Sequence, residues 1–234
     1  LLDSIIQVGD GTIGDTNEKF AMLHLDPARP RNSRTHSLDE MAPPLPSIFT
    51  AWKDSLIELE RGPAILLDLS PRLESTQRME VEEIVDSFWP GIGKTWVWTS
   101  RGKGRVDRLS LWIGQLSSPG VSRRFVRIPP DIKSKPLVIE GDYLEISEHR
   151  RPPRKGEYVT ILDAALVESG LAHEYLRDVV KDESLIWSVG NGRRPQIHHS
   201  SPANFENQNQ KLLIQSTGRL SLIHISEPTR LRRI

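Results

Sequence analysis

The chain of 234 residues contains no cysteine. This absence excludes disulfide frameworks and thiolate metal sites, and it is typical of proteins from a reducing compartment. No apolar run approaches the roughly 20 residues that a helix needs to cross a bilayer, so we expect no membrane partner. An excess of one charge is also lacking, because 31 lysines and arginines balance 31 aspartates and glutamates. Contacts with nucleic acid would therefore have to come from local basic clusters.

An initiator methionine is absent as well, and the first residues look like the approach to a strand. We therefore expect the chain to be a piece of a longer protein. Its length allows one α/β domain with an appendage, or two small domains.

The strongest local pattern lies near the start, where the apolar residues 5–8 run into residues 9–14, Gly-Asp-Gly-Thr-Ile-Gly. Glycines permit turns that other residues avoid, and they let a ligand approach the backbone amides closely. Residues 15–25 predict a helix, capped by Asp15 or Thr16. Strand, glycine turn and helix in this order are typical of a nucleotide-type site, although a hairpin turn would give the same glycine spacing.

The next segments predict an α/β sheet. Residues 42–47 contain three prolines and predict a rigid loop, and residues 48–61 predict an amphipathic helix. Residues 64–71 are apolar on both faces, which indicates a strand in the middle of a parallel sheet. Asp68 lies at the carboxyl end of this strand, where ligands bind in open α/β sheets.

Further elements follow in order. Residues 73–88 predict a surface helix and residues 95–99 a strand, while residues 125–128 and 137–139 predict two adjacent strands. Residues 91–95, Gly-Ile-Gly-Lys-Thr, do not predict a phosphate loop, because a strand rather than a helix follows them.

A basic loop follows the strand at residues 95–99. Its cationic side chains are Arg101, Lys103 and Arg105. Such a loop either grips phosphates or is simply solvated.

The pattern changes after residue 141. Residues 148–156 form a basic linker with prolines, so we place a domain boundary between residues 147 and 148. Residues 158–180 resemble one or two helices, and residues 191–210 are polar enough to predict disorder. The adjacent His198 and His199 lack acidic partners and make a poor metal site.

The last residues resemble the translated frame of a transposase-type sequencing-library adaptor. We therefore expect residues 220–234 to be an assembly artefact and exclude them from the fold. The expected organisation is a domain over residues 1–147, an extension over residues 148–219, and this artefact.

The order of these parts over residues 1–141 resembles the S-adenosylmethionine-dependent ribose methyltransferases of the FtsJ type. It resembles still more closely the cap methyltransferase domain of the large polymerase protein of non-segmented negative-strand RNA viruses. In that viral group the cofactor loop commonly reads Gly-Asp-Gly, as residues 9–11 do, and a proline pair follows, as residues 43–44 do. The resemblance implies an α/β fold with a Rossmann-like methyltransferase sheet flanked by helices, to which we add a small helical C-terminal extension.

The resemblance also implies a chemistry, which is methyl transfer from S-adenosylmethionine to a ribose 2′ oxygen or to guanine N7 of an RNA cap. The glycine turn would hold the methionine part of the cofactor and an acidic side chain would bind its ribose. The residues concerned are Gly9, Asp10, Gly11, Gly14 and Asp39, with Glu40 as the alternative to Asp39.

The family uses a lysine, aspartate, lysine and glutamate as its catalytic set, in which a lysine activates the hydroxyl. Asp68 matches the aspartate, and the first lysine would lie upstream of Leu1. The second lysine aligns with Lys94 or, in another alignment, falls on Trp98. Glu140 is our candidate for the glutamate, although it is displaced from the family position.

The implied partners are the capped 5′ end of an RNA, the remainder of a viral polymerase chain and its cofactor protein. Arg101, Lys103 and Arg105 are the candidate RNA contacts. The implied location is the virion and the cytoplasm or nucleus of the host cell.

Two other functions are open. The first is a noncatalytic RNA-binding or scaffolding domain that keeps the fold without the catalytic set. The second is a nicotinamide-dependent oxidoreductase, although the apolar second strand ending in an acid that such enzymes show is missing here.

Overall fold

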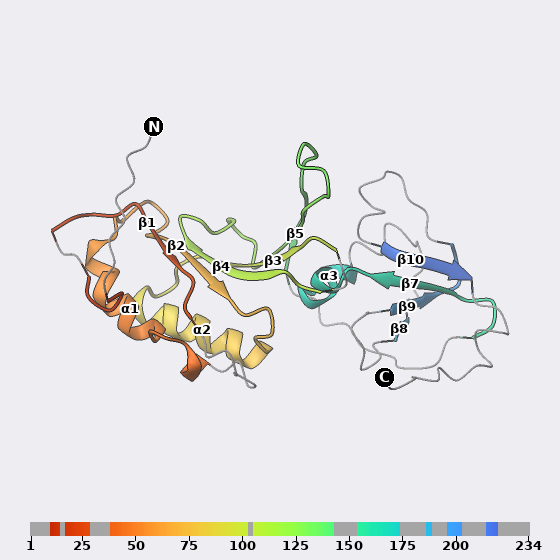
Figure 1. Cartoon of the computed structure of the whole chain (residues 1–234), viewed down its shortest axis with the longest axis horizontal. Coiled ribbons are helices and arrows are strands. Elements are labelled where there is room, and N and C mark those ends of the chain that lie inside the picture. Colours follow the sequence, from red (N-terminus) through yellow and green to blue (C-terminus); the bar gives the residue numbers. More distant parts are fainter. Residues whose placement is uncertain are drawn as a thin grey trace. The chain divides into compact units, whose positions relative to one another are not determined.

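Figure 1 shows the computed structural model of the chain, which describes residues 10–14, 17–28, 38–102, 105–142, 154–173, 186–188, 196–202 and 214–219. The chain is a mixed α/β protein that divides into two compact units. The first unit comprises Leu1–Trp96 and Leu109–Gly120, and the second comprises Val97–Arg108 and Val121–Ile234.

A six-stranded sheet has the strand order β1-β2-β4-β3-β5-β6. The strands are β1 Met22–Leu25, β2 Ala64–Leu69, β3 Lys94–Ser100, β4 Arg108–Gly114, β5 Arg123–Arg127 and β6 Leu137–Gly141. β1 and β2 are parallel, whereas β2 and β4 are antiparallel, as are β5 and β6. The prediction that residues 64–71 lie inside a parallel sheet is therefore half right, because β2 is an interior strand but only β1 runs parallel to it.

The core of the first unit is built on β2. Ile65 and Leu67 are fully buried, as are their cross-strand partners Ile113 and Leu111 on β4. A strand covered on both faces must be apolar along its length, which is why the continuous apolar run predicted this strand correctly.

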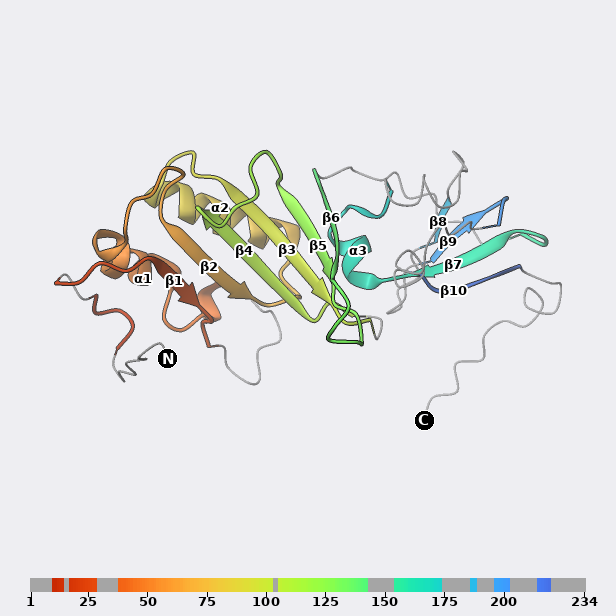
Figure 2. The ribbon, with the colours of Figure 1, turned by 90° about the horizontal axis from the view of Figure 1, so that it is seen from above.

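Two helices cover one face of the strands of the first unit (Figures 1 and 2). They are α1 Leu45–Trp52, which continues as the 3-10 helix η2 Lys53–Ser55, and α2 Ser75–Phe88. Phe49 of α1 is fully buried, and its ring lies edge to face against Phe88 and Trp89, with centroid distances of 5.4 and 5.2 Å. Each such pair contributes about 0.5–1.5 kcal/mol beyond its burial, so these aromatic contacts hold α1 against α2.

The prediction of a helix over residues 73–88 is confirmed. The helix begins at Ser75 because Glu74 and Gln77 form a capping box, in which each side chain accepts a hydrogen bond from the backbone N–H of the other residue. This arrangement satisfies two amides that the first turn would otherwise leave unpaired.

The helix predicted over residues 48–61 is displaced. It begins at Leu45, because Pro46 fits the first turn, where a missing N–H costs nothing. It is over by Leu56, which forms an isolated parallel bridge with Phe20.

The helix predicted over residues 15–25 is wrong, because residues 22–25 form β1. Leu23 and Leu25 are the less exposed residues and alternate with the exposed Met22 and His24. This is the period of a strand, and pairing with β2 overrides the weak local helix preference.

The second unit also contains a four-stranded sheet with the order β10-β7-β9-β8, drawn in teal and blue in Figure 2. Its strands are β7 Tyr158–Leu162, β8 Ile186–Ser188, β9 Gln196–His199 and β10 Ile214–Arg219, and the short helix α3 Ala164–Glu168 follows β7. Every pair of neighbours in this sheet is antiparallel.

The predicted helical C-terminal extension is therefore wrong for the described residues. Residues 158–161 are aromatic or β-branched, which favours a strand, and among the described residues after 142 only residues 164–168 are α-helical. The prediction of disorder over residues 191–210 fails at β9, whose His198 and His199 are buried. The boundary between residues 147 and 148 and the suspected artefact at residues 220–234 lie outside the described residues.

In the described part of the chain, no helix combines the length and the apolar character that crossing a membrane requires.

Packing against α1 leaves no room for a side chain at position 14, which explains the glycine there. A Cβ atom added there would lie 1.8 Å from the carbonyl oxygen of Ala51 in α1, whereas one added at Gly11 would meet nothing within 4 Å. We expect Gly14→Ala to lower the free energy of unfolding by about 1–3 kcal/mol, measured by urea denaturation. Gly11→Ala is the matched control and should stay close to the parent. Equal midpoints for the two variants would contradict this account.

Candidate functional site

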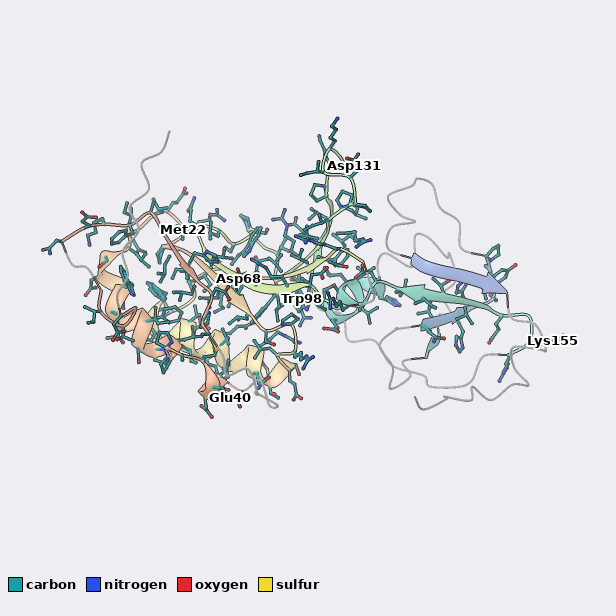
Figure 3. The ribbon with its side chains drawn as sticks, viewed as in Figure 1. Met22, Glu40, Asp68, Trp98, Asp131 and Lys155 are labelled. Carbon is teal, nitrogen blue, oxygen red and sulfur yellow. The ribbon has the colours of Figure 1, made fainter. Side chains whose placement is uncertain are left out.

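The most developed polar site in the first unit is centred on Asp68. Its Oδ1 accepts a hydrogen bond from the hydroxyl of Ser110 at 2.6 Å, and its Oδ2 lies 3.1 Å from Nε2 of His24. Asp68 pairs with Ser110 across β2 and β4, and His24 comes from β1 on the other side. Figure 3 marks Asp68 among the side chains of this unit. Three neighbouring strands thus converge on one carboxylate.

The two ends of this contact differ in exposure. The side chain of Asp68 is 7% exposed and that of His24 is 46% exposed. An ionised carboxylate only accepts hydrogen bonds, so in the tautomer that fits this contact Nε2 donates to Asp68 and Nδ1 is the nitrogen that can accept a proton. The arrangement presents an oriented imidazole that can accept a proton from a molecule in solvent.

Ser110 is not an activated nucleophile in this arrangement. Its hydroxyl donates to Asp68 and is buried, whereas a serine nucleophile needs a base such as His24 within hydrogen-bond reach. The chemistry that the site supports is therefore proton transfer.

The glycine turn is held by local hydrogen bonds. Oδ1 of Asp10 accepts from the backbone N–H of Thr12 at 2.9 Å and from its hydroxyl at 2.7 Å. The indole N–H of Trp52 donates to the carbonyl oxygen of Gly11 at 2.7 Å. Gly9 lies outside the described residues.

The described contacts place this turn near the amino end of β1. The ring of Trp52 lies 5.6 Å from that of Phe20, two residues before β1 begins. Asp68 is near the carboxyl end of β2, which runs parallel to β1. The structure therefore does not join Gly11 to Asp68 through any contact that the described residues show.

Lys94 is likewise not brought to Asp68. Its Nζ lies 2.5 Å from Oδ1 of Asp86 in α2. The residue before it, Gly93, accepts a hydrogen bond from Gly114, which pairs with the first residue of β2. Lys94 thus lies at the amino end of β2, about 13 Å along the strand from Asp68 at roughly 3.3 Å per residue.

The other candidates from the sequence have separate partners. Trp98, the alternative to Lys94, is buried in the second unit with the guanidinium of Arg123 5.3 Å from its ring centroid. Oε1 of Glu140 lies 3.3 Å from Nε of Arg124 on the neighbouring strand. Asp39 is exposed in the 3-10 helix η1 Leu38–Glu40.

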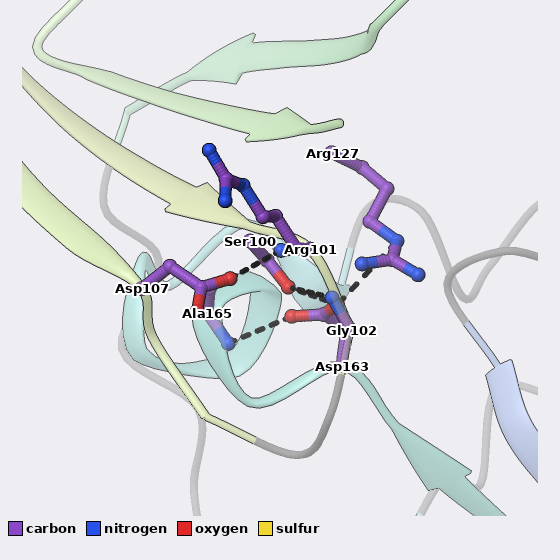
Figure 4. A network of polar contacts seen from close by, with 7 residues as sticks. All are labelled: Ser100, Arg101, Gly102, Asp107, Arg127, Asp163 and Ala165. Atoms are coloured by element: carbon purple, nitrogen blue, oxygen red, sulfur yellow. Dashed lines mark hydrogen bonds and ion pairs between the residues drawn. The ribbon is translucent and has the colours of Figure 1, made fainter. Parts of the chain in front are cut away.

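The basic loop after β3 is folded back on Asp107 (Figure 4). The carboxylate of Asp107 accepts from the backbone N–H of Arg101 at 2.5 Å and lies 3.7 Å from Nε of Arg105. Both arginine side chains are exposed. Lys103 lies outside the described residues.

Beneath this loop lies a buried polar network that sequence reasoning missed (Figure 4). The hydroxyl of Ser100 donates to Oδ2 of Asp163 at 2.6 Å and accepts from the N–H of Gly102 at 2.9 Å. Oδ1 of Asp163 caps α3 by accepting from the N–H of Ala165 at 2.9 Å. An aspartate directly before an Ala-Ala-Leu run is a typical helix cap, so this part could have been found.

Arg127 completes the network. Its Nε lies 3.9 Å from Oδ2 of Asp163, and its guanidinium lies against Gly102, where an added Cβ would meet the guanidinium atoms at 2.5–3.0 Å. The network ties the start of the basic loop to β5 and α3.

His24 is the member of this polar site that the sequence could not reveal, because it lies in a segment whose pattern predicted a helix. The described residues hold no group of three His, Asp or Glu side chains that could bind a metal ion.

Comparisons of this chain with family models, with curated proteins and with solved structures found no match.

Asp10 supplies a test by pH. The hydrogen bonds from the backbone N–H and then the hydroxyl of Thr12 hold the pKa of Asp10 below its ordinary value. Since the folded pKa is the lower one, this stabilisation is complete above the pKa of the unfolded chain and is lost as the pH falls through the folded pKa. In Thr12→Val the pKa should rise but remain depressed, because the backbone bond persists. NMR titration of the Asp10 carboxyl carbon measures both values, and an unchanged titration would contradict the assignment.

The contact between Gly102 and Arg127 supplies a second test. Gly102 has a φ of 90°, so an alanine there suffers both backbone strain and a clash with the guanidinium. Gly120 is the matched control, because its φ is 70° and an added Cβ meets nothing within 4 Å. We expect Gly102→Ala to lose about 1–3 kcal/mol more than Gly120→Ala in chemical denaturation. Equal losses of stability in the two variants would contradict this account, because they would show that the Arg127 guanidinium moves aside without destabilising the protein.

Proposed function

We propose that this chain is a methyltransferase domain that acts on RNA with S-adenosylmethionine as donor, and that Asp68 and His24 form its reaction centre. The observation that carries the proposal is the position of Asp68. Its carboxylate is near the carboxyl end of an interior strand, beside the parallel β1, and it contacts an exposed imidazole. Ligands in α/β sheets bind beyond this edge, so the site has the expected place for a reaction with a bound substrate.

The proposed chemistry needs a base. A ribose hydroxyl becomes a nucleophile when a nearby group accepts its proton. In this proposal Nδ1 of His24 accepts that proton, and the carboxylate of Asp68 orients the ring and stabilises the imidazolium that forms. His24 then takes the role of base that a lysine has in the family that this chain resembles. Lys94 has no role in the proposed reaction, because it is paired with Asp86.

Of the residues that the resemblance assigns to the cofactor, Gly11 fits and Gly14 does not. The backbone at Gly11 is open, whereas the space beside Gly14 is filled by the carbonyl of Ala51. S-adenosylmethionine would supply an electrophilic methyl group when held by Asp10 and Gly11. The described contacts leave this turn beside Trp52, near the amino end of β1 and away from Asp68, so the binding of the cofactor at Asp10 and Gly11 depends on the resemblance alone.

The partners follow from the same resemblance. Arg101 and Arg105 are exposed on a loop, and in this proposal they contact phosphates of the RNA. Lys103 is the third candidate from the sequence and lies outside the described residues. The domain would act on the capped 5′ end within a viral polymerase and its cofactor protein, in the virion and in the cytoplasm or nucleus of the host cell.

A noncatalytic RNA-binding domain is the second candidate. It is favoured by one observation, namely that Lys94 and Asp68 lie at opposite ends of the first unit's strands. Isothermal titration with S-adenosylmethionine and with NAD, followed by a methyl-transfer assay on capped RNA, separates the candidates. Binding of RNA without transfer, both by this chain and by the full polypeptide of its reading frame, would favour the second.

The reaction centre is tested by substitution. Asp68→Asn and His24→Ala should each lower the rate of methyl transfer by about 10²–10⁴-fold, because each removes part of the base. Glu83→Gln on the exposed face of α2 is the control and should keep the parent rate. Circular dichroism verifies that each variant is folded. Full activity in folded His24→Ala would remove this residue from the mechanism.

A further inference from the structure

The loop between β5 and β6 presents one apolar side chain to solvent. β5 and β6 are paired up to Arg127 and Leu137, and residues 128–136 join them. Figure 1 shows this segment as a narrow loop after β5, and Figure 3 marks Asp131 at its end. Ile132 is 98% exposed, the highest value among the large hydrophobic side chains of the described residues.

The end of this loop is preorganised. Oδ1 of Asp131 accepts from the N–H of Lys133 at 3.0 Å, and Oδ2 accepts from the hydroxyl of Ser134 at 3.2 Å. The N–H of Ser134 donates to the carbonyl of Asp131 at 3.1 Å. Prolines flank the turn at residues 129, 130 and 136 and restrict its backbone further. Little conformational entropy is therefore lost when a partner binds this turn.

Two cations accompany the isoleucine. Lys133 and Lys135 are both exposed, and both oxygens of the Asp131 carboxylate in the same turn accept hydrogen bonds. The turn thus combines one apolar tip with two ammonium groups that are free to reach anionic partners.

The chemistry of this turn, one isoleucine beside two lysines, favours one class of partner. A stable protein interface buries about 800 Å² on each side, and a membrane anchor needs more than the roughly 1.5–3 kcal/mol that one buried isoleucine supplies. Nucleic acid suits it, because apolar side chains insert between bases while lysines contact the phosphates.

We propose that residues 131–135 form a wedge for a nucleic-acid strand, with Ile132 inserted between neighbouring bases and Lys133 and Lys135 on phosphates. The proposal goes beyond the proposed function, because it needs neither S-adenosylmethionine nor Asp68. It assigns an RNA contact to a loop that the resemblance left without one.

The test uses the whole chain and a single-stranded RNA oligonucleotide that carries 2-aminopurine. Ile132→Ser should weaken binding about tenfold and abolish the rise in fluorescence that unstacking produces, with an unchanged salt dependence. The double variant Lys133→Ala/Lys135→Ala should flatten the slope of log affinity against log salt by about 1.4, since each phosphate contact on a single strand contributes about 0.7.

Matched controls separate the wedge from general surface effects. Met79→Ser removes an exposed apolar side chain from α2, and Lys53→Ala/Lys155→Ala removes two exposed charges elsewhere. Both should bind RNA like the parent. The proposal is overturned if Ile132→Ser behaves like Met79→Ser, or if it loses only affinity for anionic lipid vesicles. Failure of methyl transfer with these binding results intact would count against the proposed function alone.

Discussion

A carboxylate in a protein interior must receive hydrogen bonds, because leaving a charge there unpaired is costly. Asp68 meets this constraint through both neighbouring strands, from Ser110 on β4 and from His24 on β1. The register that sets Asp68 opposite Ser110 is therefore also the register that completes the polar site. The side chain of Asp68 thus connects the pairing of the strands in the first unit with the polar site on them.

The same reasoning explains what could be predicted from the sequence. Residues 64–69 and 75–88 form the expected strand and helix because each segment shows its burial pattern in its own sequence. The first is an apolar run broken only by Asp68, and the second has a helical period. Asp68 was accessible to the same reasoning, since a carboxylate at the end of a buried strand stands out.

The misses have physical causes of another kind. His24 is 44 positions from Asp68, so nothing near it in sequence signals their contact. Gly14 looks like a ligand-binding glycine, but the group that excludes a side chain there is the carbonyl of Ala51. Residues 158–162 and 196–199 become strands by pairing with each other, and that pairing is invisible in either segment alone. Contacts between distant segments decided each of these cases.

The position of β1 at one end of the six-stranded order has a dynamic consequence. Outer strands of a sheet exchange their amide protons and open locally more readily than interior ones, because fewer contacts hold them. His24 is on this outer strand, whereas Asp68 and Ser110 are on the two strands inside it. Brief fraying of the four residues of β1 would therefore separate the imidazole from the carboxylate while the core of the unit stayed intact, so the contact between His24 and Asp68 can open without unfolding of the unit.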